Sequence, residues 1–385
     1  MRAGETELNP EAVLEQILKR LKLETKTEFK RFLEELDTLY GSFDSKTKDK
    51  ARISQNQIPF LVKFWLNWFK KCESEKYFFC YNVKSFNKRK FISLEIVALD
   101  PREITLSLFK GSYSCLNLTG TVNPYVFNNL TGLNYKFKND TNGNSNEGTK
   151  GYTEILADSP FKSRNIKALI TEGINTGRDS RTPATYKKMI SSILEVVEST
   201  PGNVGVFCAS YKILNDLRMN GITAAIKSKQ LFVEQPNLNA SENALLLSNF
   251  KNQSKKGGAV LLGVCGGRNS EGEDYPGDFM NAVMIAGLPY HLPTPRVQAK
   301  ISYYNKVFRN QGWLFAYLYP AMQRANQASG RPIRKENDKG AIIFMDSRFK
   351  DKMNWISDWV KKEIKIVPDR RGVLKNELTQ FWFNM

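Results

Sequence analysis

Histidine is almost absent from this chain of 385 residues, which contains one, His291. Catalysis that depends on several histidines is therefore excluded, and we expect His291, in a Pro-rich stretch, to be structural. The five cysteines are few and scattered, and the closest pair, Cys72 and Cys80, has no third or fourth ligand nearby. This spacing argues against a disulfide framework and against a metal or iron–sulfur site built within this chain.

Long apolar runs are also missing. No run approaches the roughly 18–20 residues of a transmembrane helix, and residues 1–13 lack the apolar core of a signal peptide. We therefore expect a soluble protein without a membrane partner, located in the cytoplasm or associated with the nucleoid. Hydrophobic residues make up 41% and aromatic residues 12% of the chain, which is enough for a packed core and excludes a disordered tail protein. The length suits two domains, or one domain with a large appendage.

Negative charge is in deficit. The chain has 57 Lys and Arg residues against 39 Asp and Glu, a net charge of +18. Such a surplus favours a polyanionic partner, either nucleic acid or an acidic membrane surface. The alternative is a Lys-rich solvated surface without such a partner.

The N-terminal third is predicted to be helical. Asn9 and Pro10 form a helix start signal, and apolar residues then recur at helical spacing in three segments: residues 10–21, 26–40 and 59–72. The third segment carries an aromatic stripe, which favours a packed core over a base-stacking surface. Four strands are expected next, within residues 77–83, 91–99, 103–109 and 115–119. The polar, Gly-rich residues 139–151 are the clearest linker.

The rest of the chain alternates strands with helices. The expected strands are residues 168–172, 203–210, 230–233, 259–265, 282–289 and 340–348. The expected helices are residues 185–197, 211–219, 243–252, 294–311, 318–330 and 353–360. This alternation predicts an α/β fold, a parallel sheet with helices on both faces.

A complete nucleotide site is missing. The nearest match to a phosphate-binding P-loop, Gly143 to Lys150, has Thr149 and Lys150 in inverted order and follows no apolar strand. No acidic box follows an apolar strand. The chain therefore carries no complete nucleotide site of its own.

The most informative segment reads Q-x-x-G-R-x-x-R, from Gln327 through Gly330 and Arg331 to Arg334. Two arginines three residues apart on a helix can face the same way. Their planar, permanently charged guanidinium groups suit a γ-phosphate, and Gly330 lets the backbone approach closely. The alternative is a basic surface helix.

Three further strand ends carry small or polar residues. They are Thr119-Gly120-Thr121, Ser210-Tyr211, and a loop over residues 266–275 that is rich in Gly and acidic side chains. Such loops at the carboxyl ends of parallel strands commonly build a ligand site.

These four segments, in this order, resemble motifs III, IV, V and VI in the C-terminal half of superfamily 2 DNA helicases of the XPD and DinG type. The resemblance covers residues 91–349 and includes the Ser-Pro-Phe at 159–161. Motif V departs from the usual pattern: it reads CGGR instead of ARGK, and Glu273 replaces a common apolar residue. Motifs I and II and the cysteines of the iron–sulfur cluster are absent. The resemblance therefore implies a fragment, a split-gene product or a degenerate paralogue.

The resemblance also implies an architecture. Residues 1–85 would form a helical, arch-like segment, and residues 86–150 the last strands of a first motor domain and a linker. Residues 151–385 would form a second, RecA-like motor domain. The partners would be single-stranded DNA and the missing N-terminal helicase domain, which would hold most of the contacts to ATP and Mg²⁺.

Site roles follow from the same resemblance. Arg331 and Arg334 would be arginine fingers, and Gln327 would seat the phosphates or the attacking water. The residues implied in contacting ATP or coupling it to DNA are Glu271, Gly272, Asp274, Gly330, Thr119 and Thr121. The residues implied in touching the DNA backbone are Ser210, Tyr211, Arg268 and Ser270.

The implied function is ATP-driven DNA unwinding, with DNA repair as the usual pathway, and we expect the chain alone to be inactive. The alternative is a non-catalytic, basic subunit that binds nucleic acid or a partner and retains a helicase C-terminal fold.

Overall fold

The computed structural model describes residues 4–44, 58–86, 89–136, 138–139 and 151–383. The chain forms two compact units that do not follow its linear order. The smaller unit comprises Met1–Cys115, Asn129–Lys136 and Leu292–Ala316, and the larger comprises Leu116–Asn128, Phe137–His291 and Tyr317–Met385. Most of the expected linker, and the rejected P-loop match, lie outside the described residues.

The smaller unit combines helices with an antiparallel sheet of three strands. Its three predicted N-terminal helices are confirmed as α1 (Pro10–Leu21), α2 (Lys26–Asp44) and α4 (Ile58–Lys71). The side chain of Asn9 caps α1, accepting hydrogen bonds from the amides of Glu11 and Ala12. The sheet order is β1 (Gly4–Glu7), β2 (Tyr77–Phe86) and β3 (Arg89–Ala98), of which β2 and β3 were predicted.

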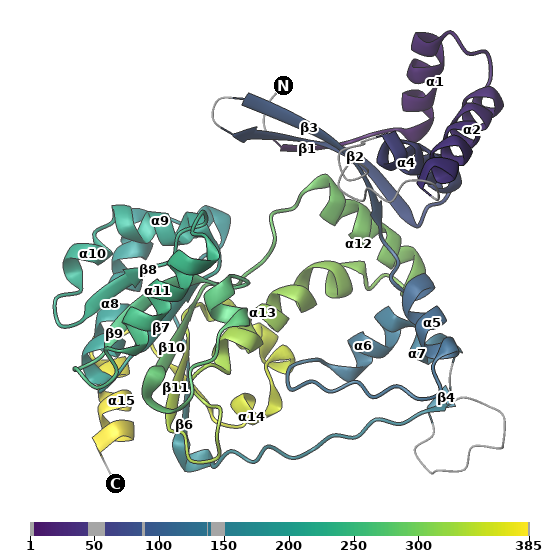
Figure 1. Cartoon of the computed structure of the whole chain (residues 1–385). Helices are drawn as coiled ribbons and strands as arrows, with labels where there is room; N and C mark the ends of the chain where they lie inside the picture. The colour runs from purple at the N-terminus through teal and green to yellow at the C-terminus, as the bar shows by residue number, and fades with distance from the viewer. Residues whose placement is uncertain (1–3, 45–57, 87–88, 137, 140–150, 384–385) are drawn as a thin grey trace. The chain divides into compact units, whose positions relative to one another are not determined.

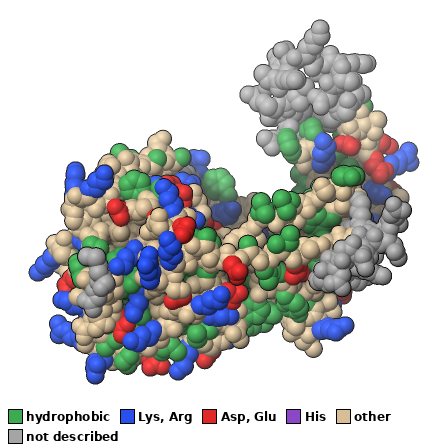
Figure 2. Space-filling model, turned by 90° about the horizontal axis from the view of Figure 1, so that it is seen from below, with side chains coloured by type: hydrophobic (Ala, Val, Ile, Leu, Met, Phe, Trp, Pro, Cys, Tyr) green, Lys and Arg blue, Asp and Glu red, His purple; other side chains and the backbone are tan. Residues whose placement is uncertain are grey.

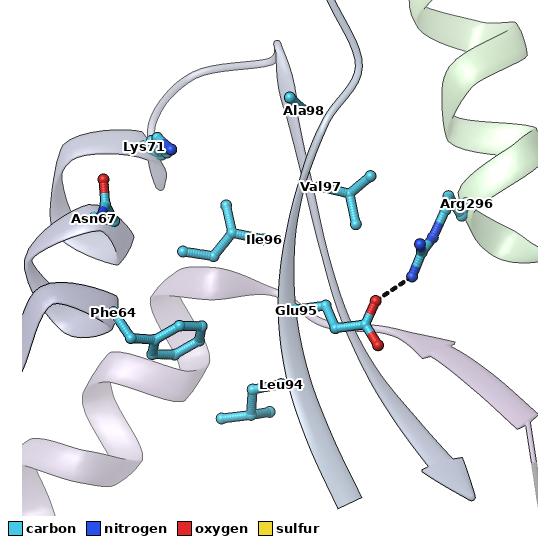
Figure 3. A pocket seen from close by; sticks show the side chains of 9 residues that line it. All are labelled: Phe64, Asn67, Lys71, Leu94, Glu95, Ile96, Val97, Ala98 and Arg296. Atoms are coloured by element: carbon cyan, nitrogen blue, oxygen red, sulfur yellow. Dashed lines mark hydrogen bonds and ion pairs between the residues drawn. The ribbon is translucent and has the colours of Figure 1, made fainter. Parts of the chain in front are cut away.

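The aromatic stripe of α4 mainly forms core, as expected. Trp68 is fully buried and its ring centroid lies 4.6 Å from that of Phe79 on β2. Phe60, at the start of the helix, is 69% exposed. A groove of about 510 Å³ lies beside this core, between α4 and β3. Phe64 lines it, and the ion pair of Glu95 with Arg296 lies at one end (Figure 3). Arg296 lies on α12 (Pro295–Val307), so the ion pair joins that helix to the sheet.

Two strand predictions are wrong. The strand expected at residues 103–109 is a helix, α5 (Arg102–Gly111), which starts directly after Pro101. The carbonyl of Pro101 accepts the backbone amides of Ile104 and Thr105, and the side chain of Asp100 accepts that of Arg102 at 3.0 Å, so amides of the first turn have partners. The strand expected before Thr119 is not formed, and its Leu116 and Leu118 are 81% and 83% exposed. None of the described sheets includes this segment.

The larger unit contains a sheet of seven strands in the order β12-β6-β11-β10-β7-β9-β8. Every neighbouring pair is parallel. The strands are β6 (Ile166–Thr171), β7 (Val204–Cys208), β8 (Gln230–Val233), β9 (Ala259–Val264), β10 (Ala282–Ala286), β11 (Gly340–Phe344) and β12 (Ile364–Val367). The predicted α/β fold with a parallel sheet is therefore confirmed.

Helices cover both faces of this sheet (Figure 1). One face packs on α8 (Pro183–Ser199), α9 (Tyr211–Met219) and α15 (Val373–Phe383). The other packs on α11 (Ala240–Lys251), α13 (Tyr319–Ser329) and α14 (Asp358–Lys361). The predicted helices are confirmed except at residues 353–360, where a 3₁₀ segment (Ser347–Trp355) precedes the short α14.

Two elements near the C-terminus were not predicted, so residues 340–348 are not the last strand of the chain. The edge strand β12 has four residues with Lys365 among its apolar ones, and α15 follows the turn at Gly372. A strand this short at a sheet edge carries too weak an alternating pattern to be recognised. No helix in the described ranges is both long and apolar enough to cross a membrane.

Candidate functional site

The carboxyl ends of the parallel strands share one edge of the sheet, and three adjacent strands bring polar residues together there. β7 is followed by Ser210 and Tyr211, β8 by Glu234, and β9 by a loop that begins at Cys265. Ser210 caps α9, accepting a hydrogen bond from the amide of Ile213 at 3.4 Å. This places Tyr211 at the first position of the helix.

The loop after β9 is built around a single π-helical turn, Arg268–Gly272. Its inner side chains, Asn269 and Ser270, are fully buried. The hydroxyl of Ser270 donates to the carbonyl of Gly267 at 3.1 Å, and the hydroxyl of the buried Tyr275 donates to the carbonyl of Asn269 at 3.0 Å. Ser270 therefore stabilises the loop from inside and does not face solvent.

Arg331 lies against this loop and is only 5% exposed. Its Nε donates to the carbonyl of Ser270 at 2.7 Å, and its Nη1 donates to the carbonyl of Glu273. Burial, and to a smaller extent the positive charge of Arg334, lower the pKa of Arg331. The guanidinium group nevertheless stays charged, as arginine does in proteins. The expectation that Arg331 and Arg334 lie on a helix is wrong: α13 ends at Ser329, because the chain turns over residues 330–332, and Arg334 lies in an irregular segment after this turn.

Arg334 differs from Arg331 in exposure and in partner. Its Nε lies 2.8 Å from a carboxylate oxygen of Asp274, and the two side chains are 35% and 69% exposed. The backbone of Arg334 is fixed by Asp338, whose carboxylate accepts hydrogen bonds from the backbone amides of Arg334 and Lys335 at 2.8 and 2.7 Å. Two arginines and one carboxylate singled out from the sequence thus meet at one loop.

Glu234 is a residue that sequence reasoning missed. It follows the predicted strand β8, is 5% exposed, and accepts hydrogen bonds from the Tyr211 hydroxyl at 2.9 Å and from Asn269 Nδ2 at 3.1 Å. Burial raises the pKa of Glu234, against the lowering effect of those two hydrogen bonds. A glutamate in Phe-Val-Glu-Gln carries no sequence signal of its own. Only the parallel pairing of β8 with β9 brings it to the loop.

Arg324 on α13 is a second missed residue. It donates to the carbonyl of Pro289 at 3.2 Å and contacts the ring nitrogen of His291. Burial lowers the pKa of Arg324. Its side chain also packs beside Gly266, where φ is +78° and an added Cβ would lie 3.0 Å from Arg324 Cδ.

The remaining predicted residues lie around the carboxyl edge of the seven-stranded sheet or on the segment around Thr119. Arg268, Glu271 and Gly272 are all exposed on the loop, and Arg268 donates a hydrogen bond to the carbonyl of Leu238 at 3.3 Å. Gln327 is half-buried on α13. Gly330 has φ −76°, and the nearest atom to an added Cβ is 3.6 Å away, so this fold does not require glycine there.

Thr119 and Thr121 form a local turn, with the amide of Thr121 donating to Thr119 Oγ1 at 3.3 Å. The residue two positions on, Asn123, donates its amide to the hydroxyl of Tyr319 at 2.7 Å, at the first position of α13. The turn is therefore connected to α13.

No group of three or more His, Cys, Asp or Glu side chains converges as a metal-binding set in the described part of the chain. Cys208 and Cys265 lie at the site edge but are buried, and burial raises the pKa of both thiols. Their thiolate forms are suppressed, which makes them packing residues and not nucleophiles.

Comparison with known proteins places these elements in a wider context. Residues 193–363 match the family described as Helicase C-terminal domain. The chain is 31% identical over 249 residues to a protein named Regulator of telomere elongation helicase 1 homolog from Drosophila sechellia, covering 60% of this chain and 25% of that protein. It is 27% identical over 356 residues to the ATP-dependent DNA helicase CHL1 of Debaryomyces hansenii, covering 84% of this chain and 40% of that protein.

This chain is also similar to solved structures. The chain superposes on the structure titled "Structure of S. tokodaii Xpd4" with a TM-score of 0.55 at 16% identity, covering 95% of this chain and 62% of that one. A second structure, titled as an XPD helicase, gives a TM-score of 0.54 at 17% identity, covering 94% and 62%. At these identities the likeness establishes the fold, which confirms the expected RecA-like arrangement. The chain spans only a quarter to two-fifths of the length of the sequence relatives described above.

Proposed function

Because this chain carries a C-terminal region of an XPD-like superfamily 2 helicase, we propose that it supplies the second motor domain of an ATP-dependent DNA helicase. In this proposal it acts with a first motor domain, contributes arginine side chains to ATP hydrolysis, and contacts single-stranded DNA. The observation that carries the proposal is the meeting of Arg331, Arg334 and Asp274 at the loop after β9.

Arg334 is the better placed of the two arginines to meet a phosphate. An ion pair between side chains as exposed as Arg334 and Asp274 contributes about 0–1 kcal/mol, so a phosphate can replace the carboxylate at little cost. A guanidinium group offers a fork of donors that matches phosphate oxygens and stabilises the negative charge of the transition state. Asp274 would then hold Arg334 until the nucleotide arrives.

Arg331 has a second task in this proposal. Its guanidinium links the carbonyls of Ser270 and Glu273, so it shapes the loop that carries Asp274. Gln327, one turn earlier on α13, would contact the phosphates or the attacking water.

ATP is the substrate of the proposed reaction, and Mg²⁺ neutralises phosphate charge when it is bound. We assign Mg²⁺ to the first motor domain, because this sequence has no acidic box after an apolar strand to hold it, and we use it in no step here.

Single-stranded DNA is the proposed polyanionic partner. Tyr211 and Arg268 lie at the ends of neighbouring strands, and Arg268 is exposed. Figure 2 shows many Lys and Arg side chains on one face of the larger unit, interspersed with fewer acidic ones. With the net charge of +18, these features support binding to phosphates without strong sequence preference. DNA repair is the pathway that we infer from the family.

One observation favours the alternative, a non-catalytic subunit that keeps the fold. Both arginines already have partners within the chain: carbonyl oxygens for Arg331 and a carboxylate for Arg334. In that case the arginines would stabilise the loop, and the basic surface would bind nucleic acid or a partner protein.

The experiment is a titration of a fluorescent oligothymidylate with the purified chain at several salt concentrations. Binding with a slope of about −0.7 in log K against log salt for each phosphate neutralised supports the proposal. No binding at low salt, or a flat dependence, contradicts it. Because the sequence contains neither a P-loop lysine nor an acidic box, phosphate release from ATP by the chain alone should stay at background. DNA-stimulated turnover would contradict the assignment of the catalytic motifs to another domain.

A further inference from the structure

The buried network around Glu234 joins two parts of the site that the proposed function treats separately. One carboxylate oxygen accepts from the hydroxyl of Tyr211 at 2.9 Å, and the other accepts from the side-chain amide of Asn269 at 3.1 Å. Tyr211 follows β7, whereas Asn269 lies inside the loop after β9. A single carboxylate therefore bridges two strand ends.

Further hydrogen bonds hold Asn269 and Glu234 in place within this network. Asn243 Nδ2 donates to Asn269 Oδ1 at 3.0 Å, which turns the amide of Asn269 toward Glu234. The backbone amide of Glu234 donates to the carbonyl of Leu262 at 2.9 Å and extends the pairing of β8 with β9. The carboxylate is thus held from its backbone and from both of its oxygens.

Two glycines make room for the carboxylate. A Cβ added at Gly263 would lie 2.7 Å from one oxygen of Glu234, and a Cβ added at Gly267 would lie 2.5 Å from the other. Neither contact is possible for a real side chain. Gly263 in β9 and Gly267 in the loop after it therefore leave space for this glutamate.

The network continues to the arginines through the backbone. Asn269 immediately precedes Ser270, whose carbonyl accepts from Arg331 Nε at 2.7 Å. Glu234 is thereby connected on one side to Tyr211, a proposed DNA contact, and on the other to the loop that Arg331 and Asp274 share. Side chains linked by hydrogen bonds in this way can couple two sites when the linked loop has alternative positions.

We propose that Glu234 is a positioning residue that couples the nucleic-acid contact at Tyr211 to the loop after β9, and through Ser270 to Arg331. This inference rests on the proposed function for its DNA side. The coupling depends on the shape of the hydrogen-bond network and not on the charge of Glu234. A glutamine at this position can accept from Asn269 through its oxygen and donate to the Tyr211 oxygen through its amide.

The experiment compares Glu234→Ala, Glu234→Gln, Tyr211→Phe and the Glu234→Ala/Tyr211→Phe double variant. The matched control is Glu195→Ala: this glutamate also bridges two segments, accepting the amides of Gly372 and Lys375 at 2.7 and 3.2 Å, but it lies on α8, away from the loop. Two quantities are measured on the full chain: amide hydrogen exchange in peptides covering residues 265–275, and affinity for a fluorescent 20-nucleotide oligothymidylate.

Glu234→Ala leaves the buried amide of Asn269 without its acceptor, so we expect exchange in residues 265–275 to accelerate about tenfold and DNA affinity to fall about tenfold. Glu234→Gln should keep both close to the parent values, and Glu195→Ala should change neither. Tyr211→Phe should weaken DNA binding in the parent and have no further effect in Glu234→Ala, because the hydroxyl has then lost its partner.

Unchanged exchange in Glu234→Ala, additive effects of the two single variants, or a Glu234→Gln protein as impaired as Glu234→Ala would each overturn the proposal. If the parent chain does not bind the oligonucleotide, the proposed function fails on its own. In that case the exchange of residues 265–275 without DNA still decides whether Glu234 positions the loop. If Glu234→Ala does not fold, Glu234→Gln and Tyr211→Phe still test the proposal. A coupled network requires that Glu234→Gln has a mild effect and that Tyr211→Phe weakens DNA binding.

Discussion

Arg331 Nε donates to the carbonyl oxygen of Ser270 over 2.7 Å, and this hydrogen bond joins the segment after α13 to the loop after β9. The arginine is 5% exposed, whereas the side chain of Arg334, three residues on, is 35% exposed. Displacing Arg331 therefore leaves two carbonyls without a charged donor, and displacing Arg334 breaks only an exposed ion pair. The two arginines should respond differently to substitution.

Arg331→Ala should lower the free energy of unfolding by about 2–4 kcal/mol, because it removes hydrogen bonds from a buried charged group and leaves their acceptors unsatisfied. Arg331→Lys should not restore the loss, because a single ammonium group cannot reproduce the fork that reaches both carbonyls. Urea unfolding monitored by circular dichroism measures this. Arg334→Ala is the matched control and should cost less than about 1 kcal/mol. Equal losses for the two alanine variants would show that Arg331 does not hold the loop.

Arg268→Ala should weaken binding to single-stranded DNA and reduce the salt slope by about 0.7, the contribution of one phosphate contact. Its guanidinium is exposed and donates to one backbone carbonyl, of Leu238, so the variant should fold normally. Fluorescence anisotropy at four salt concentrations gives the slope. A variant with weaker binding but an unchanged slope would place Arg268 away from the DNA backbone.

Lys229 should make the free energy of unfolding depend on pH. Its Nζ donates to the carbonyls of Thr200 and Gly202, and burial lowers the pKa of Lys229 from 10.5 to about 8. Between these two pH values the unfolded chain binds more protons at this lysine than the folded protein. Its contribution therefore raises the free energy of unfolding as the pH rises through that window.

The measurement is urea unfolding of the parent and of Lys229→Met at pH 7 and pH 9.5. The difference in unfolding free energy, parent minus variant, should grow by about 1–2 kcal/mol over this range, allowing for partial exposure. A constant or shrinking difference would mean that Lys229 keeps an ordinary pKa in the folded protein.

Most of the sheet was predictable because its strands are buried on both faces and read as short apolar runs, such as Ala259–Val264. α5 was mistaken for a strand because Ile104, Thr105 and Leu106 suit either structure, and the helix depends on backbone contacts to Pro101. The segment around Leu116 was expected to be a strand from its composition. Composition cannot reveal that none of the described strands pairs with it.

The site was predictable where its residues belong to a recognisable sequence motif. The loop after β9 and the segment after α13 were both singled out, and Arg334 meets Asp274 there. Their burial was not predictable: Arg331 and Ser270 face inward because the π-helical turn at Arg268–Gly272 directs carbonyls toward the arginine. Glu234 and Arg324 were missed because neither is part of a recognised motif, and only the pairing of β8 with β9 and the packing of α13 bring them to the loop.

The most direct test of the account is the rate of DNA-stimulated ATP hydrolysis when a first motor domain is supplied by fusion or in trans. Arg334→Ala should lower kcat by about 10³-fold, the scale of an arginine finger, while the apparent KM for ATP changes far less, because the lost contact acts in the transition state. Arg334→Lys should not rescue turnover, and Arg371→Ala, at an exposed arginine before α15, should match the parent. A folded Arg334→Ala assembly that hydrolyses ATP at the parent rate would contradict the account.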